Sequence, residues 1–488
     1  MTDGRPAPPS RSTAWTWESL LVEPRRPLVI REQPNAHWFA VAAVCIGALM
    51  GQLDASIVTV ALPTLQHAFD ASVGAVTWVG LSYLLVLVAT VTAVGRFADM
   101  WGRKLLYVYG FVLFVVASAA CGLAPNLLAL CGFRALQAVG AAMLQANSLA
   151  IIVLCVPARS LGRAIGLQGA AQAIGLALGP TVGGLLLAAG GWRLIFYVNV
   201  PIGVIGAVAA LALVPRSQNL ARRVRFDWRG LGLFIPTVAA LLYALSFGAT
   251  AGWTSPLIIG LFAGTIALGV TFVVSEHRDA DPMLDLGLLT RPRFATGIAS
   301  AVGSYLVMFG VLLVVPFYLE GGLHLGASRA GVELMAMPVA FGLVAPFAGR
   351  LADRTGARPL TVSGMALVAA GLVALGAARP GTWGLVLLLA VIGVGLGLFT
   401  SPNNASIMGA APEQQAGMAS GVLNMSRGLG TSLGLALTGL VFTVAGGTVA
   451  HRFSVTALVL AAVAVAVGGV AALRARGDLA DAALHENL

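Results

Sequence analysis

The chain has 488 residues, of which 58% are hydrophobic and 10% are charged, and its formal net charge is +10. Soluble domains carry about 25% charged residues, so this composition excludes a soluble globular protein for most of the chain. The basic excess does not indicate a nucleic-acid-binding protein, because the arginines lie in short connections between apolar runs and form no single stripe. We therefore predict an integral membrane protein.

The sequence shows no cofactor site and no catalytic site. Its cysteines form no CxxC motif and no Cys/His cluster, so we expect neither a metal centre nor a redox centre. A phosphate-binding GxxxxGK[ST] loop is absent, which argues against direct use of ATP. No nucleophile and base stand out as a pair. We expect a protein that is not an enzyme and holds no cofactor.

About fourteen apolar runs are long enough to cross a bilayer, since a spanning helix needs roughly 20 mostly apolar residues. None of them alternates with a period of two, so we expect helices and no strands. The predicted fold class is all-α and integral to the membrane. The spans lie near residues 38–62, 75–97, 105–123, 127–150, 165–189, 193–214, 230–249, 256–275, 296–319, 331–351, 360–378, 382–407, 417–445 and 455–473.

Basic residues collect before the first span and in every second connection after it, where cytoplasmic loops are expected to be basic. This pattern predicts that both termini are cytoplasmic, and an even number of spans agrees. Arg329, Arg379 and Arg452 are exceptions, because they fall in presumed outer loops. We expect residues 1–37 to form a disordered tail, because they are rich in Pro and Arg, and residues 474–488 to form a second cytoplasmic tail.

A short motif occurs twice. Gly95-Arg-Phe-Ala-Asp99-Met-Trp-Gly102-Arg103 returns 254 positions later as Gly349-Arg-Leu-Ala-Asp353-Arg-Thr-Gly356. The repeat divides the chain into two six-helix bundles, residues 38–214 and 296–473, with a linker at 215–295 that carries two extra spans. Related halves predict a substrate path at their interface.

Each copy of this motif lies in a cytoplasmic connection between two spans. Gly95 permits close helix contact, Asp99 can face the positive end of a helix, and Arg103 and Lys104 can pair with it. Such a cluster forms in one arrangement of the halves and breaks in the other, so we interpret it as an inner latch. A charged turn that only fixes topology is the alternative, and two copies at matching places favour the latch.

The fifth span has a face without side chains. Gly175, Gly179 and Gly183 recur every fourth residue, Gly184 follows, and Pro180 removes a backbone donor and bends the helix. We expect this flat, bent helix to let the two halves pack tightly and pivot. Ordinary small-residue packing explains any one of these glycines but not the whole set.

Asp54 lies inside the apolar first span, where a charge costs at least about 2.5 kcal/mol. Binding a proton lowers that cost, which makes Asp54 a candidate proton carrier. Arg134 in the fourth span lies at a matching depth, since a rise of 1.5 Å per residue places both about 10–12 Å below the outer surface. We expect the two to meet and to couple protons to transport; the alternative is a static buried ion pair.

Other intramembrane polar side chains are candidates for a substrate cavity: Gln137, Asn147, Gln168, Gln172, Asn424 and Arg427. Arg427 has no obvious acidic partner in the sequence, which suggests an anionic group or a carbonyl as its ligand. Single aromatic and Met residues such as Tyr305 and Met308 are expected to face lipid or to fill packing space.

These motifs together resemble the major facilitator superfamily. The two loop copies are similar to its loop signature, and Gly175-Leu-Ala-Leu-Gly179-Pro180-Thr-Val-Gly183-Gly184 matches the antiporter signature of its drug:proton exporters. Trp192-Arg193-Leu-Ile-Phe196-Tyr-Val-Asn199-Val-Pro201 resembles the sixth span of its fourteen-helix branch. Arg134-Ala-Leu-Gln137-Ala138 differs from the family pattern in carrying Ala138 in place of Gly, and Ser56 and Thr59 depart from the usual span-one residues.

The resemblance implies a proton-coupled secondary transporter that exports drugs, antibiotics or other lipophilic molecules across the bacterial cytoplasmic membrane. Protonation of Asp54 from outside would displace the substrate. The expected partners are a small lipophilic molecule, protons and membrane lipid, with no nucleic acid, and we expect a monomer. The alternatives are a proton-coupled uptake permease for a metabolite, a lipid or natural-product exporter and, less favoured, a non-transporting membrane sensor.

Overall fold

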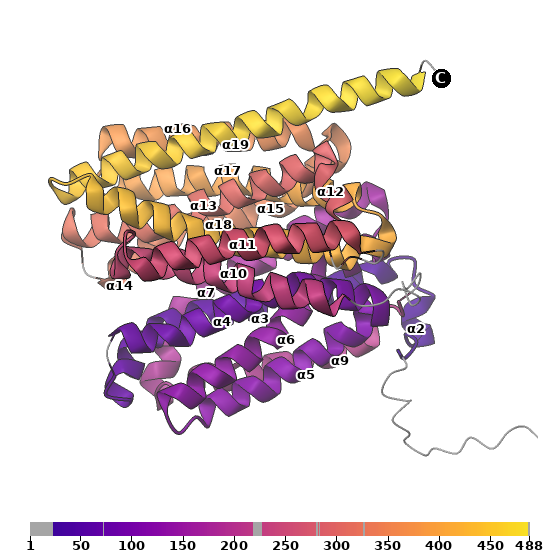
Figure 1. The fold of residues 1–488 in the computed structure, drawn as a ribbon, viewed down its shortest axis with the longest axis horizontal. Helices are drawn as coiled ribbons and strands as arrows, with labels where there is room; N and C mark the ends of the chain where they lie inside the picture. The colour runs from indigo at the N-terminus through magenta and orange to yellow at the C-terminus, as the bar shows by residue number, and fades with distance from the viewer. Residues whose placement is uncertain are drawn as a thin grey trace, which may run out of the picture.

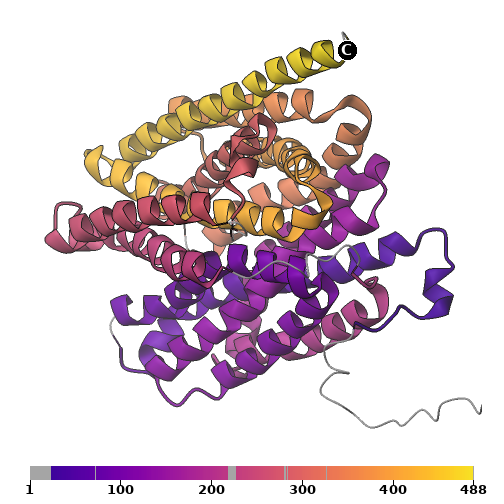
Figure 2. The same ribbon diagram turned by 45° about the vertical axis from the view of Figure 1, so that its right-hand side comes forward.

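The computed structural model describes residues 23–71, 73–217, 227–279, 282, 284–325 and 327–486. All regular structure within these ranges is helical. Long helices run roughly side by side, with the first half of the chain and the last half forming two neighbouring groups (Figure 1). Figure 2 shows the same two groups from a second direction, with the C-terminal helix along the outer edge of the second group.

The first group contains the helices of the N-terminal half. A short helix, α2, precedes it, and a 3₁₀ turn at Ala158–Ser160 leads into α7. The bounds are α2 Leu28–Arg31, α3 Ala36–Ala68, α4 Val73–Trp101, α5 Arg103–Gly122, α6 Leu127–Cys155, α7 Leu161–Gly190, α8 Leu194–Tyr197 and α9 Asn199–Leu213.

The second group follows a pair of helices, α10 Trp228–Ala251 and α11 Pro256–Arg278, and the short α12 Leu286–Thr290. A 3₁₀ turn at Glu413–Gln415 leads into α18, as the first turn leads into α7. The remaining bounds are α13 Pro292–Gly321, α14 Ala327–Leu334, α15 Ala336–Thr355, α16 Ala357–Ala378, α17 Thr382–Ala410, α18 Ala416–Val444 and α19 Val449–Glu486.

The number of membrane spans agrees with the sequence. Among the described residues, 13 helices are long and apolar enough to cross a bilayer, and the bent α7 makes a fourteenth if it counts as one span. Its segments Ala158–Gly179 and Thr181–Gly190 meet at 44°. A proline stands at this break and cannot donate a backbone hydrogen bond to the preceding turn, which explains the bend. The predicted all-α membrane fold is confirmed.

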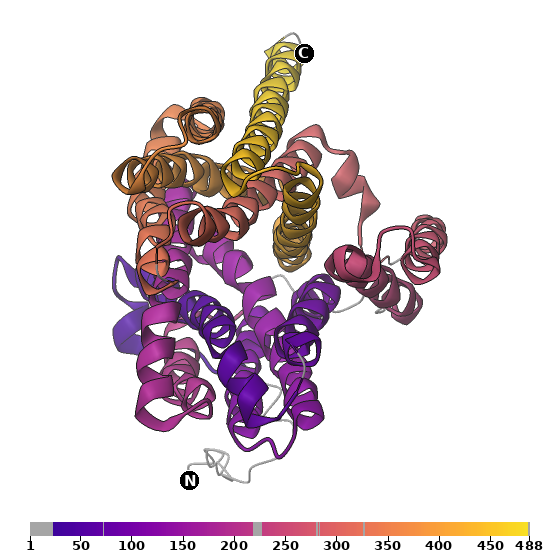
Figure 3. The ribbon, with the colours of Figure 1, turned by 90° about the vertical axis from the view of Figure 1, so that its left-hand side faces the viewer.

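Two pairs of helices make the most extensive contacts between the halves: α7 packs along α15, and α4 packs along α18. α18 also contacts α6, and α17 contacts α7. Viewed along the helices, α10 and α11 lie on one flank (Figure 3), where α10 contacts both α4 and α18. α11 contacts α10 and little else among the described helices, and its large apolar side chains, such as Ile266 and Val270, are exposed. In a bilayer these side chains face lipid, so the extra pair belongs to the periphery.

The predicted disordered tail is wrong for part of its length. Residues 1–22 lie outside the described residues, but Glu23 is buried and accepts hydrogen bonds from the Leu105 amide at 3.1 Å and the Ser217 hydroxyl at 2.8 Å. The carboxylate thus accepts a hydrogen bond at the start of α5, where backbone amides have no partner within the helix. Lys104 donates from Nζ to the Pro24 carbonyl at 2.8 Å. Charge and proline content alone did not reveal this anchoring.

The predicted tail at 474–488 is helical as far as the structure describes it, because α19 continues to Glu486. The segment after the last apolar run is rich in Ala, Leu and Arg, which favour the helix and let it extend beyond the hydrocarbon region.

Candidate functional site

Asp54 lies in the middle of α3 and is fully buried. Its Oδ2 accepts a hydrogen bond from Arg134 Nη1 at 2.7 Å. Its Oδ1 accepts from Asn199 Nδ2 at 2.7 Å and from Gln137 Nε2 at 3.0 Å. Three helices, α3, α6 and α9, therefore converge on one carboxylate, and both of its oxygens are occupied. A buried carboxylate persists in hydrocarbon only with such partners.

Arg134 connects this carboxylate to α4. Its Nη1 also donates to Gln137 Oε1 at 2.7 Å, and its Nε donates to the Val79 carbonyl at 3.2 Å. The guanidinium carbon lies 4.2 Å from the centroid of the Tyr83 ring, in cation–π geometry. Removing the charge of Asp54 would leave this buried cation without its counter-ion, and the network would have to rearrange.

A second layer holds the amides in place. Ser118 Oγ accepts hydrogen bonds from Gln137 Nε2 and Asn199 Nδ2, each at 3.1 Å, and donates to the Phe196 carbonyl at 2.9 Å. Neither Asn199 nor Ser118 was expected from sequence to take part. Asn199 is 145 positions from Asp54, and its signals in the sequence are a polar side chain at the start of an apolar span and its place in the Trp192–Pro201 motif.

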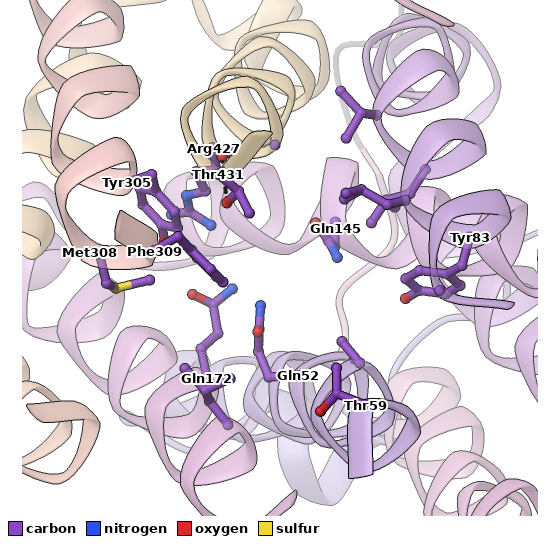
Figure 4. Close-up of a pocket in the computed structure, with 18 of the residues that line it drawn as sticks. Gln52, Thr59, Tyr83, Gln145, Gln172, Tyr305, Met308, Phe309, Arg427 and Thr431 are labelled. Carbon is purple, nitrogen blue, oxygen red and sulfur yellow. Dashed lines mark hydrogen bonds between the residues drawn. The ribbon is translucent and has the colours of Figure 1, made fainter. Parts of the chain in front are cut away.

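A cavity of about 380 Å³ lies between the two halves, next to this network. Its walls come from α3, α4, α6 and α7 on one side and from α13, α15, α17 and α18 on the other. Figure 4 shows Gln52, Gln172 and Tyr83 facing Arg427 and Tyr305 across the space. Asp54 is not among the described residues that line it. Arg134 and Tyr83 are, so they stand between the carboxylate and the cavity.

Three of the predicted cavity residues line this space, and three do not. Gln172, Asn424 and Arg427 are in the lining. Gln137 is instead bound to Asp54 and Arg134, and Asn147 Nδ2 donates to the Met143 carbonyl of its own helix at 2.7 Å. The fully buried Gln168 borders a minor hollow between α3, α6 and α7. The prediction that these three residues line the cavity is therefore corrected. Their side chains are polar and intramembrane, but their amides bind other groups of the protein.

Several lining residues were missed or misjudged. Tyr305 and Met308, expected to face lipid or to fill packing space, both line the cavity. Gln52, Gln145 and Thr431 also line it and were not singled out. In lipid, the outer and inner faces of a span are both apolar, so residue type alone does not separate a cavity face from a lipid face.

The first latch consists of Asp99, Arg103 and the start of α18. The fully buried Asp99 accepts hydrogen bonds from the Gly417 amide at 2.8 Å and the Met418 amide at 2.9 Å. Arg103 Nη2 lies 2.6 Å from Asp99 Oδ1 and also donates to the Glu413 carbonyl at 2.9 Å. The expected pairing with Lys104 is not seen, because Lys104 is bound to Pro24.

The second latch consists of Asp353 and the start of α7. Asp353 accepts from the Gly162 amide at 2.7 Å and the Arg163 amide at 3.1 Å. Each aspartate thus caps a helix of the opposite half, where free amides and the helix dipole favour a negative charge. The glycines of the motif bring the backbones together: a Cβ at Gly95 would overlap the Gly417 carbonyl, and one at Gly349 would overlap the Gly162 carbonyl.

Gly102 and Gly356 sit at the turn of each motif copy. Their φ angles are 119° and 83°, in the region that residues other than glycine rarely adopt. Each glycine ends one helix of a latch and begins the next. This fixes the position of the aspartate one turn earlier, so the glycines are needed for local geometry.

The cavity and the latches occupy different depths. On α4, lining residues run from Gly80 to Val91, and close packing on α18 continues beyond them, where Thr92 lies against Gly421 and Gly95 against Gly417. On α7, Gln172 and Leu176 line the cavity, whereas Gly162 and Gly166 pack on α15. The halves are therefore in contact on the side that carries the latches, and the cavity extends from mid-membrane toward the other side.

The glycine face of α7 does not join the halves, contrary to expectation. A Cβ at Gly175 would overlap the Leu49 carbonyl of α3, one at Gly179 would overlap Ser56, and Gly183 lies against Ile57. Gly184 faces open space among the described residues, and the Pro180 side chain is not among those the structure describes. The glycines instead seat α7 on the helix that carries Asp54, and Ser56 Oγ donates to the Leu176 carbonyl at 2.9 Å.

Comparisons with known proteins agree with this architecture. The family model described as "Major Facilitator Superfamily" matches residues 44–281 and 297–482. "Multidrug resistance protein Stp" of Mycobacterium tuberculosis (strain CDC 1551 / Oshkosh) is 37% identical over 402 residues, which cover 82% of this chain and 74% of that protein. "Riboflavin transporter RibZ" of Clostridioides difficile (strain 630) is 33% identical over 401 residues, or 82% and 87% of the two chains.

A solved structure shares the fold. The human organic anion transporter MFSD10 (TETRAN) matches with a TM-score of 0.66 and 14% sequence identity, covering 90% of this chain and 100% of that chain. At this identity the likeness concerns the arrangement of helices alone.

Proposed function

The chain belongs to the major facilitator superfamily, and on that premise we propose that it is a proton-coupled transporter of the bacterial cytoplasmic membrane. In this proposal it exports drugs, antibiotics or other lipophilic small molecules in exchange for protons. The observation that carries the proposal is the fully buried Asp54–Arg134 pair beside a cavity shared by the two halves.

The proton step follows from the surroundings of Asp54. A carboxylate with a buried counter-ion and two amide donors is stable as an anion only while those partners stay in place. Protonation removes the attraction to Arg134 and leaves a buried cation that favours a different arrangement. Arg134 lines the cavity and Asp54 does not, so protonation of Asp54 acts on the substrate through Arg134. The displacement of the substrate that was expected from sequence is therefore indirect.

Alternating access supplies the transport step. With both latches formed, the cavity is closed toward the latch side, and the halves must separate there to open it. The latch side carries Arg96, Arg103, Arg159 and Arg163, so the positive-inside tendency makes it the cytoplasmic side. In this proposal the carrier is closed toward the cytoplasm, both termini are cytoplasmic, and a single chain is the working unit.

The substrate class rests on the cavity and on a relative. Its walls are mostly apolar, with side chains such as Leu84, Phe309 and Phe341, which suits a lipophilic guest. A relative at 37% identity is named as a multidrug resistance protein. The chemistry of the site needs no bound cofactor beyond the proton.

An uptake permease is the second candidate. Amide side chains from three helices, Gln52, Gln145 and Gln172, line the cavity and offer more hydrogen bonds than a purely lipophilic guest requires. A relative at 33% identity is named as a riboflavin transporter. The direction of proton-driven movement separates the two candidates.

The test uses everted membrane vesicles with an imposed proton gradient, acid inside, and a panel of fluorescent drugs. We expect gradient-dependent accumulation of at least one drug and its loss in Asp54→Asn. Asp70→Asn is the matched control, because it makes the same chemical change at an exposed carboxylate that follows the same helix, in a left-handed conformation that Asn tolerates. Accumulation that persists in Asp54→Asn, or movement only in the opposite direction, would contradict the proposal.

A further inference from the structure

One cation in the cavity wall has no anionic partner among the residues that the structure describes. Arg427 of α18 is 6% exposed and lines the cavity. Its Nη1 donates to Asn424 Oδ1 at 3.0 Å, and its guanidinium carbon lies 5.6 Å from the centroid of the Tyr305 ring. Its Nε has no hydrogen-bond partner in the described part of the chain. A guanidinium in this setting is held in place by an amide and a ring, and its charge is not neutralised.

The other cation of the wall differs in this respect. Arg134 lies 2.7 Å from Asp54 and is neutralised by it. Of the described residues that line the cavity, none is an aspartate or a glutamate. The lining therefore carries one uncompensated positive charge, and that charge is on Arg427. A buried cation without a counter-ion is unfavourable, so an anion that binds there removes a penalty as well as making a charge-assisted hydrogen bond.

The surroundings of Arg427 define the rest of the ligand. Met308, Phe309 and Phe341 supply apolar surface in the same cavity. Thr431 lies one turn from Arg427 on the same helix, and its hydroxyl donates to the Arg427 carbonyl at 3.0 Å. Figure 4 shows Arg427 and Thr431 projecting into the space near Tyr305 and Phe309. A ligand that uses all of these groups has one acidic group and a flat or bulky apolar body, within about 380 Å³.

We propose that the substrate is an amphipathic organic anion whose carboxylate, sulfonate or phosphate group binds Arg427. This rests on the proposed function and narrows its substrate class. A permanently cationic drug meets repulsion at the same place. Export of an anion also moves negative charge outward, which the inside-negative potential of a bacterial membrane favours.

The test compares two dyes with the same xanthene body and opposite charge, fluorescein and rhodamine 123, at pH 8. Fluorescence polarisation with the full chain in lipid nanodiscs measures their binding. We expect the wild type to bind fluorescein about tenfold more tightly than rhodamine 123, and Arg427→Gln to lose about tenfold in fluorescein affinity, the loss of one charge-assisted bond. Arg427→Lys, which keeps the charge, should retain most of the affinity.

Arg193→Gln is the matched control, because Arg193 is exposed on a connection outside the cavity. Equal melting temperatures of the variants show that folding is intact. Tighter binding of rhodamine 123, no binding of fluorescein, or fluorescein binding unchanged in Arg427→Gln would each overturn the anion site.

Transport of the same dyes into everted vesicles separates this inference from the proposed function. Proton-driven movement of rhodamine 123 without fluorescein binding contradicts the anion site but agrees with the proposed proton-coupled transport. Fluorescein that binds through Arg427 but does not move with a proton gradient supports the anion site and contradicts proton-coupled export.

Discussion

The two latches have the same backbone design and different charges. Asp99 and Asp353 each accept two amides from the first turn of a helix in the opposite half. Asp99 is fully buried and paired with Arg103, whereas Asp353 is half-buried and has no ion pair among the described residues. The position that corresponds to Arg103 in the second copy is Ala357.

Helix capping and charge pairing are therefore separable parts of the latch. Capping across the interface is common to both copies. The ion pair is added only where α4 meets α18, and there it binds a third element, the Glu413 carbonyl. We therefore expect close glycine packing and capping to hold both seams, with the ion pair as an additional contribution at the α4–α18 seam.

The largest effect is expected for Asp99→Asn. The change leaves Arg103 buried without its counter-ion, which costs about 3–5 kcal/mol. Hydrogen exchange measured by mass spectrometry should show the Gly417 and Met418 amides exchanging roughly a hundredfold faster or more, as the closed arrangement loses population. Unchanged protection of this segment would show that the ion pair does not hold the seam.

Gly95→Ala and Gly349→Ala come next and should act alike. Each new methyl group would overlap a backbone carbonyl that cannot move independently, and overpacking of this kind costs about 1–3 kcal/mol. Exchange should rise at the seam that carries the change and stay constant at the other. Gly184→Ala, which meets open space on the opposite part of α7, is the control and should leave both seams protected.

Asp353→Asn should be milder than Asp99→Asn. Asparagine still offers one oxygen to the Gly162 and Arg163 amides, and no buried cation is left behind, so we expect a loss of about 1–1.5 kcal/mol. The corresponding rise in exchange at residues 161–165 is roughly tenfold. Equal effects of the two Asp→Asn changes would remove the distinction between the latches.

The smallest effect is expected for a gain of charge. Ala357→Arg places an arginine where the first latch has Arg103, four residues after Asp353. Because Asp353 is only half-buried, the new pair should contribute no more than about 1 kcal/mol. Slower exchange of the Gly162 and Arg163 amides, by a few-fold, would sharpen the comparison. Faster exchange would show that the second seam has no room for the pair.

The sequence predicted the helical membrane fold, the repeat and the approach of Asp54 to Arg134, because each depends on length, spacing or depth along a helix. The sequence did not predict the long-range hydrogen-bond partners. Asn199 donates to Asp54 across 145 positions, and the Gly417 amide donates to Asp99 across 318 positions, and no periodic pattern connects such pairs.

The sequence also did not predict which face of a helix packs against which neighbour. Gly175 and Gly179 were expected at the interface between the halves and lie on α3, while Tyr305 and Met308 line the cavity. An apolar span gives no signal for which side meets lipid, a neighbour or a hollow, because all three surroundings accept the same side chains.

Counterflow measurements test whether Asp54 carries the coupling proton. In proteoliposomes, wild type and Asp54→Asn are compared for exchange of labelled against unlabelled substrate without a gradient, and for accumulation driven by a proton gradient. We predict that Asp54→Asn keeps the exchange, since Asp54 is not among the described residues that line the cavity, and loses the driven accumulation. Driven accumulation at the wild-type level in Asp54→Asn would contradict the account.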